Sequence, residues 1–306
     1  MTLRRTRRLN EYLAIYETRK EHPDYPLNIL CGLLDVNRSA YYKWISHINS
    51  ENDDLNELIS AMVLEIHGGH PDMGYRRIRD TLEHDHGIRV NDKRVLRICR
   101  KKKVQSCIKH KYNCCTKPAS DPAYVAENIL NREFDSEKPN EKWLTDVSEF
   151  KYGTGDDDKK GKLYLSVILD LCGRIPVSYE YSDHNDNPLV FNTFDRALAA
   201  RPGAAPVFHS DRGYQYTSKV FRQKIVDAGM TQSMSRVAHC IDNGPMEGFW
   251  GVMKREMYYG RKFKTKEELI HAIEEYIDYY INHRVQRRLG VLTPMEFYNQ
   301  KTMTAA

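Results

Sequence analysis

Three acidic residues, Asp146, Asp211 and Glu247, are of the right type and in the right places to hold metal ions together. Asp146 lies in the strand-like segment KWLTDVSEFKY, Asp211 ends the segment APVFHSD, and Glu247 lies early in PMEGFWGVMKREMYY. Magnesium prefers oxygen ligands, and two such ions roughly 3.5–4 Å apart can activate an attacking oxygen and stabilise a leaving one at a phosphodiester. The acids therefore predict a site for two Mg²⁺ ions, for which Mn²⁺ is a possible substitute.

Each of these acids also has an ordinary structural alternative. Asp146 could be a solvent-facing strand residue, although the apolar residues around it indicate a buried strand. Asp211 could begin a turn. Glu247 could cap the start of its helix, because it is the third residue if Pro245 is the first. For each acid taken singly, the structural alternative is at least as probable as a metal role. It is improbable that all three alternatives hold together, because the acids lie in two strands and a helix as a metal site requires.

Other candidate ligands have simpler interpretations. The acids Asp156–Asp158 are typical of a solvated hairpin turn, Asp170 of a structural or supporting acid in a strand, and Asp242 of a residue that caps or steers the following helix. The seven cysteines include no CxxC pair, so the group that comes closest to a metal-ligand cluster is expected to be reduced thiols in a basic linker, with a zinc site as the lesser alternative. That group is Cys107, His110, Cys114 and Cys115.

The elements that would position the acids follow from the change of periodicity after residue 141. Segments 142–152, 162–171 and 174–182 predict three antiparallel strands. A helix is expected to begin at Asn187 and Pro188 and to end at about Ala200. A fourth strand is expected at 205–211, followed by a helix from the cap Thr217 to Gly229. A fifth strand is expected at 230–235 and a further helix at 245–259. This order predicts an α/β, ribonuclease-H-like fold: a five-stranded mixed sheet with helices on both faces, with two acids on neighbouring central strands and the third on the last helix.

The front of the chain predicts small helical domains. Residues 26–45 predict a short helix, a turn at Asp35–Asn37 and a second helix from Arg38, which is typical either of a DNA-binding helix-turn-helix or of an ordinary helical hairpin. Segment 73–87 predicts a helix that stops at Gly87, and Asn91 is expected to cap the next one. On that helix a cationic face is formed by Arg94, Arg97 and Lys101.

Composition favours a nucleic-acid partner for this front part. Residues 1–120 carry 22 Lys and Arg against 15 Asp and Glu, whereas the whole 306-residue chain has a net charge of only +5. The longest apolar run, at 163–171, is too short to cross a bilayer, and the basic N-terminus has no apolar segment after it. We therefore expect no membrane partner and a cytoplasmic, nucleoid-associated location. The expected domains are a helix-turn-helix region at 1–50, a second helical DNA-binding domain at 51–111, a linker at 112–141, and a catalytic core with a C-terminal helical tail at 142–306.

Several motifs resemble one known family. WLTDVSEF, FHSDRGYQYTS, SMSRVAHCIDNGPMEGFWGVMKREM and YINHRVQRRLGVLTPMEFY, with GYRRIRDTL and VNRSAYYKW towards the N-terminus, closely resemble the insertion-sequence transposases of the IS-three family, in the DDE and retroviral-integrase superfamily. The resemblance covers nearly the whole chain and includes 35 residues between the last two acids. It implies a DNA strand-transfer enzyme of bacterial origin with Asp146, Asp211 and Glu247 as its metal-binding triad. It also implies that Tyr214 and Tyr216 lie in a loop that turns away from the site.

The resemblance extends to DNA contacts and partners. Lys254 shares a helical face with Glu247 and is expected to hold a phosphate next to the scissile bond. Further DNA contacts are expected from basic residues of the motifs and helices above: Arg38, Arg76, Arg77, Arg94, Arg97, Lys101 and Arg284. The expected partners are double-stranded DNA (terminal inverted repeats and target), further copies of the chain on that DNA, and an upstream-frame protein.

The chain departs from the family pattern next to the third acid. The pattern is closer to DNAPMESFFG, whereas this chain has Gly244, Gly248 and Trp250, which are expected to affect local helix packing alone. Two other functions remain open at this point. Another ribonuclease-H-like nuclease would not need the helix-turn-helix front, and a non-catalytic DNA-binding regulator would not need the acids.

Overall fold

The computed structural model describes residues 3–46, 51–108, 125–153, 161–236 and 240–305. Its contacts divide the chain into two units, residues 1–70 with 92–105 and residues 71–91 with 106–306. The predicted turn at Asp156–Asp158 lies outside the described residues, as do three members of the Cys107 group and much of the predicted linker. None of the helices in the described ranges is long and apolar enough to span a membrane.

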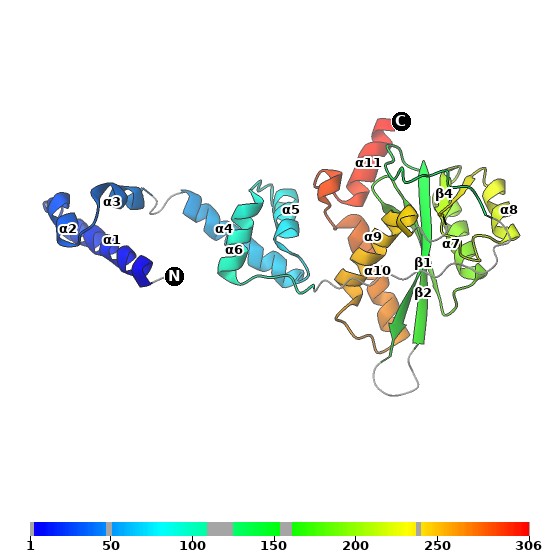
Figure 1. Ribbon diagram of the computed structural model, residues 1–306, viewed down its shortest axis with the longest axis horizontal. Coiled ribbons are helices and arrows are strands. Elements are labelled where there is room, and N and C mark those ends of the chain that lie inside the picture. The colour runs from blue at the N-terminus through cyan, green and yellow to red at the C-terminus, as the bar shows by residue number, and fades with distance from the viewer. Residues whose placement is uncertain (1–2, 47–50, 109–124, 154–160, 237–239, 306) are drawn as a thin grey trace. The chain divides into compact units, whose positions relative to one another are not determined.

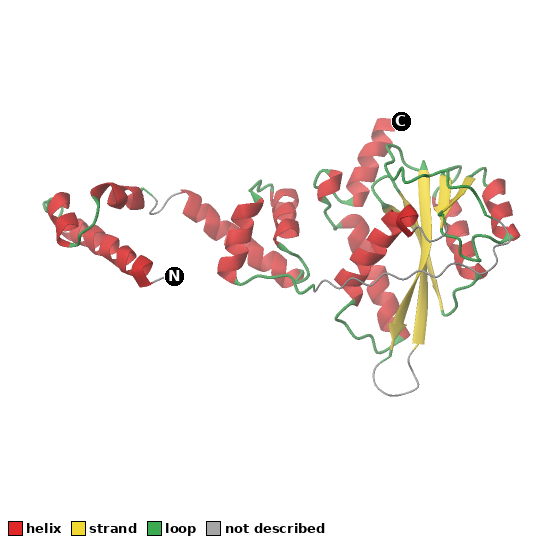
Figure 2. Ribbon diagram, in the orientation of Figure 1, coloured by secondary structure: helices red, strands yellow, loops and turns green. Residues whose placement is uncertain are grey.

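The first unit is helical (Figures 1 and 2). Its described helices are α1 (Leu3–Glu21), α2 (Leu27–Leu33), α3 (Arg38–Ile45), α4 (Glu51–Gly69) and α6 (Asp92–Lys102). The two helices and the turn predicted at 26–45 are confirmed, and the second helix begins at Arg38, as predicted. The turn contains Asp35 in a left-handed conformation (φ 50°), and the Asn37 side chain caps α3 by accepting a hydrogen bond from the Ser39 backbone N–H at 2.8 Å.

Burial in the first unit leaves charged side chains facing solvent. Ile15, Leu27 and Tyr41 belong to the apolar core of α1–α3. On α6 the residues Val95, Ile98 and Cys99 are buried. Because helical neighbours share a face at spacings of three and four, the remaining face of α6 is basic and exposed.

The described part of the second unit contains one five-stranded mixed sheet in the order β3-β2-β1-β4-β5. Strand β1 pairs antiparallel with β2 and parallel with β4, β2 pairs antiparallel with β3, and β4 pairs parallel with β5. The strands lie where the sequence predicts them: β1 (Lys142–Tyr152), β2 (Gly161–Asp170), β3 (Ile175–Ser182), β4 (Val207–Ser210) and β5 (Thr231–Met234).

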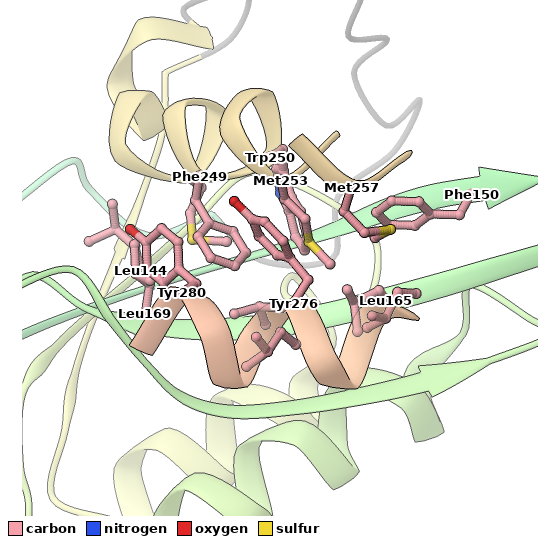
Figure 3. Close-up of a cluster of buried hydrophobic side chains, with 14 of the residues drawn as sticks. Leu144, Phe150, Leu165, Leu169, Phe249, Trp250, Met253, Met257, Tyr276 and Tyr280 are labelled. Carbon is pink, nitrogen blue, oxygen red and sulfur yellow. The ribbon is translucent and has the colours of Figure 1, made fainter. Parts of the chain in front are cut away.

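Helices cover both faces of this sheet (Figure 1). The described helices of the unit are α5 (Tyr75–His86), α7 (Asn187–Ala200), α8 (Lys219–Asp227), α9 (Gly244–Met253), α10 (Lys266–Asn282) and α11 (Pro294–Ala305), with short 3₁₀ turns at Cys240–Asn243 and Arg287–Leu289. One apolar core joins β1 and β2 to α9 and α10, and Figure 3 shows its side chains pointing toward one another from these elements. A second core joins the opposite face to α7 and α8.

Side-chain alternation along β1 decides which core each residue faces. Leu144 and Phe150 belong to the core under α9, and Trp143 belongs to the opposite core. Since strand residues two apart point to the same face, Asp146 is on the α9 side. The fold therefore places the first candidate acid beneath the helix that carries the third.

Two helix boundaries differ from the sequence prediction. The cap of α8 is Ser218, whose hydroxyl accepts a hydrogen bond from the Phe221 N–H at 3.2 Å, rather than Thr217. Helix α9 ends at Met253 and is followed by a π-helical turn, Lys254–Tyr258, so the predicted helix at 245–259 is not uniformly α-helical.

Helix α5 is attached to the C-terminal part of its own unit by ion pairs. They join Arg77 to Glu256 at 2.8 Å, His84 to Glu296 at 2.8 Å, and Asp80 to Arg287 at 2.7 Å. Gly87, with φ 65°, ends α5 as predicted. These side-chain contacts thus hold α5 against three segments of the second unit, near residues 256, 287 and 296.

Candidate active site

The register of β1 and β4 brings Asp146 and Asp211 side by side. The two strands run parallel with Leu144 opposite His209, and each aspartate lies two residues further along its chain. Both carboxyl groups are partly buried. Burial, and after it the charge of Asp211, raise the pKa of Asp146 to about 7, and Glu247 pushes the pKa in the same direction. Burial also raises the pKa of Asp211, against a hydrogen bond donated by the Gly213 N–H at 2.9 Å.

Glu247 lies in the first turn of α9, the helix that packs on β1, and its charge reaches Asp146. Its side chain is exposed, and because α9 starts at Gly244 rather than Pro245, Glu247 is the fourth residue of the helix and not the third, where a glutamate caps the helix start. The Asn243 amide donates to the carbonyl oxygen of Thr145 at 3.2 Å, which ties the start of α9 to β1 next to Asp146. In the part of the chain that the structure describes, no three His, Cys, Asp or Glu side chains are grouped closely enough to hold a metal ion.

The chemistry of the aspartate pair nevertheless fits a divalent cation. Two carboxyl groups with raised pKa values, one of them raised by the other, repel each other when both are ionised. A cation bound by both removes that repulsion, and carboxylate oxygens are the donors that Mg²⁺ and Mn²⁺ prefer. The exposed Glu247 side chain can turn toward the pair by changing rotamer.

Trp250 is a member of the site that the sequence did not identify. Its indole Nε1–H donates a hydrogen bond to Oδ2 of Asp146 at 3.0 Å. The departure from the family pattern at this position therefore does more than alter packing. The sequence pattern that could have indicated a role for Trp250 is its spacing of three residues from Glu247 on α9, because residues three apart lie on the same face of a helix.

Lys254 lies on the same side of the sheet. Its ammonium nitrogen is 5.0 Å from the centre of the Phe150 ring, and the side chain is partly buried. Burial lowers the pKa of Lys254, while the charges of Asp146 and Glu149 act in the opposite direction. The π-helical turn after α9 thus starts with a cation within electrostatic reach of the first candidate acid.

The loop after Asp211 only partly turns away from the site. Tyr214 is exposed, as expected. Tyr216 is buried, and its hydroxyl lies 3.2 Å from the Thr145 hydroxyl, beside Asp146. Burial, and after it the charges of Asp146 and Asp211, raise the pKa of Tyr216 well above its ordinary value. Tyr216 therefore packs next to the aspartate pair, on the Thr145 side of β1.

The other acids singled out in the sequence have structural partners. Asp170 is fully buried and accepts hydrogen bonds from the Asn140 N–H at 2.8 Å and the Cys172 N–H at 2.9 Å, and burial raises its pKa to about 6. Asp242 is paired with Arg236 and Arg132, which hold its pKa far below the ordinary range. Asp242 thus steers the chain into α9.

The basic residues expected to contact DNA divide into two groups. Exposed side chains belong to Arg38, Arg76, Arg97 and Lys101. The partly buried ones have partners within the chain: Arg94 donates to Asn56 at 2.9 Å, and Arg77 and Arg284 both pair with Glu256 at 2.8 Å. Arg77 and Arg284 are not proposed as DNA contacts, because both guanidinium groups pair with the buried carboxylate of Glu256.

Comparison with known proteins decides the family. Family models described as "Integrase core domain" match residues 136–240 and 247–302, and one described as "HTH-like domain" matches residues 53–112. The transposase InsK assigned to insertion sequence element IS150 of Escherichia coli is 34% identical over 282 residues, covering 91% of this chain and 95% of the relative. The chain belongs to the insertion-sequence transposases with an integrase core domain.

The resemblance to the IS-three family and the α/β fold class are thereby confirmed for this transposase-family chain. The transposase InsF for insertion sequence IS3A of Escherichia coli is 26% identical over 289 residues, covering 92% of this chain and 96% of that one. A solved structure of the HTLV-2 integrase catalytic core domain in complex with magnesium is similar to 53% of this chain, with 18% identity and a TM-score of 0.40.

Proposed function

We propose that this chain is a metal-dependent DNA transposase that cuts DNA at the ends of its element and joins those ends to a target. Asp146, Asp211 and Glu247 would hold two divalent ions, with Mg²⁺ as the natural metal and Mn²⁺ as a substitute. The observation that carries the proposal is the aspartate pair, with Asp146 on β1 and Asp211 directly after the adjacent parallel strand β4, beside the helix that bears Glu247 and packs on β1. Family membership supports polynucleotidyl transfer as the class of reaction.

The reaction requires no covalent intermediate with the protein. Water attacks the phosphorus at the element's end and displaces the 3′-oxygen, which leaves as a hydroxyl. That 3′-hydroxyl then attacks a target phosphodiester in line and displaces the target strand's own 3′-oxygen. When bound, the two ions activate the attacking oxygen and stabilise the leaving one. The chain's own residues hold the reacting groups in place: the acids orient the site, and Lys254, beside Asp146, is positioned to hold a neighbouring phosphate.

We propose that the helical N-terminal residues, from α1 to α6, bind DNA. The exposed cations of α3, α5 and α6 supply phosphate contacts, and the turn between α2 and α3 presents α3 as a recognition helix. We propose that the bound DNA is double-stranded, namely the terminal inverted repeats and the target. Joining two element ends favours more than one copy of the chain on the DNA, and an upstream-frame protein is a further proposed partner.

Asp211→Asn tests the proposal. The amide keeps the shape of the side chain but loses the charge, so we expect divalent-dependent end cleavage and strand joining to fall to background while binding to the element's ends stays near that of the unmodified chain. The measurement is cleavage and joining of labelled end DNA with Mg²⁺ or Mn²⁺. Asp195→Asn, the same change at an exposed acid of α7, is the matched control and should cleave and join normally.

The same assay separates the alternatives. Another ribonuclease-H-like nuclease would cleave without joining the product to a target. A DNA-binding regulator would bind the ends and do neither, with or without divalent ions. Retained joining in Asp211→Asn would reject the proposed metal site.

A further inference from the structure

Trp250 makes a hydrogen bond of defined direction to the first candidate acid. The indole Nε1–H is a donor only, and it lies 3.0 Å from Oδ2 of Asp146. The contact joins residues 104 positions apart in the sequence, one on α9 and one on β1. It therefore depends on how the helix packs on the sheet and on the identity of the side chain at position 250, since a phenylalanine there would have no donor.

The indole ring is held by the core and has little freedom to move. Trp250 is only 7% exposed. Its ring contacts Phe249 edge-on with centroids 5.2 Å apart, and Phe150 edge-on at 6.5 Å. Figure 3 shows Trp250 on α9 beside Phe249 and Met253, above the strands. Close-packed aromatic rings occupy a single rotamer, so the donor is a fixed point in the site.

The helix that carries the indole is also fixed against β1. The Asn243 amide at the start of α9 donates to the Thr145 carbonyl oxygen at 3.2 Å, one residue before Asp146. The acceptor and the donor of the Trp250–Asp146 bond therefore lie on elements joined by a second hydrogen bond. An aspartate on a strand has several rotamers, and a fixed donor on one of its oxygens selects among them.

We propose that Trp250 is a positioning residue for Asp146, whose carboxylate it holds in the orientation in which the Asp146–Asp211 pair binds a divalent cation. This inference rests on the metal-dependent function proposed above. Groups that hydrogen-bond to metal ligands orient those ligands, and their loss typically lowers metal affinity or activity about 10–100-fold. Trp250 would act before DNA arrives, by keeping the pair ready for the ion.

The test measures Mn²⁺ affinity of the full chain without DNA, by electron paramagnetic resonance of the free ion, together with thermal stability. Two variants remove the donor: Trp250→Phe, and Trp250→3-benzothienylalanine, which keeps the size and shape of the ring but has sulfur in place of N–H. We expect both to weaken Mn²⁺ binding by about 10-fold or more, with the melting temperature of the benzothienyl variant nearly unchanged. Trp143→Phe, a fully buried tryptophan in the opposite core, is the matched control and should keep the Mn²⁺ affinity.

The outcomes distinguish this inference from the proposed function. If the Trp250 variants bind Mn²⁺ as tightly as the unmodified chain while Asp211→Asn loses the ion, the positioning role is wrong and the metal site stands. If Trp250→Phe binds weakly but the benzothienyl variant binds normally, packing rather than the hydrogen bond is responsible, and the inference is overturned. If the unmodified chain and Asp211→Asn bind Mn²⁺ alike, the proposed function itself fails.

Discussion

Lys254 combines two features that are rarely found in an ordinary surface lysine. It is partly buried over the Phe150 ring, and it lies within electrostatic reach of Asp146. A lysine that only served the fold would contribute a cation–π contact of about 0.5–2 kcal/mol and nothing to the reaction. A lysine that holds a phosphate would contribute mainly to the reaction.

Replacing Lys254 separates these two roles. We expect Lys254→Ala to change the melting temperature little but to slow end cleavage and joining, and Lys254→Glu to be slower still because it repels the DNA backbone. The measurement is the cleavage rate at fixed Mg²⁺ beside a thermal melt. Lys266→Ala, which removes a lysine paired with the exposed Asp183, should leave both unchanged. Normal rates in both Lys254 variants would make this residue a packing lysine.

At the level of single residues, the sequence predicted the acids but not their partners. Asp146, Asp211 and Glu247 could be chosen because two predicted strands and the helix after the fifth strand each carry an acid, and metal-dependent phosphodiester chemistry needs several carboxylates. The donor from Trp250 and the burial of Tyr216 beside Asp146 could not be predicted, because both depend on side-chain packing between distant segments. The same reason explains Arg77 and Arg284, whose charge suggested DNA contact until the structure placed Glu256 between them.

Glu256 is the centre of the connection between α5 and the end of the second unit. Its side chain is 7% exposed and accepts hydrogen bonds from Arg77, Arg284 and Tyr276. Burial raises the pKa of Glu256, but the hydrogen bonds and charges of the two arginines outweigh burial and lower it below the usual range. The carboxylate is therefore ionised at neutral pH and compensates two partly buried cations.

Removing that charge should destabilise the second unit. We expect Glu256→Gln to cost about 3 kcal/mol and to lower the melting temperature by roughly 6–12 °C, because it removes the acidic partner of Arg284 and leaves Arg77 paired with Asp72 alone. Differential scanning calorimetry of the whole chain measures it. Glu267→Gln, at an exposed acid of α10, should shift stability by no more than about 0.5 kcal/mol. A melting temperature for Glu256→Gln equal to that of the control would show that these ion pairs contribute nothing.

At the level of elements, periodicity predicted the strands and most helices because alternation and helical spacing are local properties. It did not predict the π-helical turn Lys254–Tyr258, because one extra residue in a turn leaves the apolar pattern nearly unchanged. It also chose Thr217 over Ser218 as the cap of α8, since both residue types are common helix caps and the backbone geometry that decides between neighbours is not visible in the sequence.

At the level of the whole molecule, we expect the exposed cations of the first unit to contact DNA phosphates. Arg97→Ala should weaken DNA binding about equally for all sequences and reduce the slope of log affinity against log salt concentration by about 0.9, the value for one phosphate contact. Arg97→Ala with Lys101→Ala should double that change. Fluorescence anisotropy at several salt concentrations measures the slope. Arg196→Ala, at an exposed arginine of α7, is the control. An unchanged slope in the double variant would show that this face of α6 is exposed to solvent and does not contact DNA.

Whether Asp146, Asp211 and Glu247 hold divalent ions can be seen in a crystal structure of the chain grown with Mn²⁺, with data collected at the manganese absorption edge. We expect an anomalous peak within about 2.0–2.3 Å of carboxylate oxygens from both Asp146 and Asp211, with the Glu247 side chain turned toward it, and no such peak in Asp211→Asn. A well-ordered site in the unmodified chain that contains no manganese at this pair, or a manganese peak that persists in Asp211→Asn, would contradict the account.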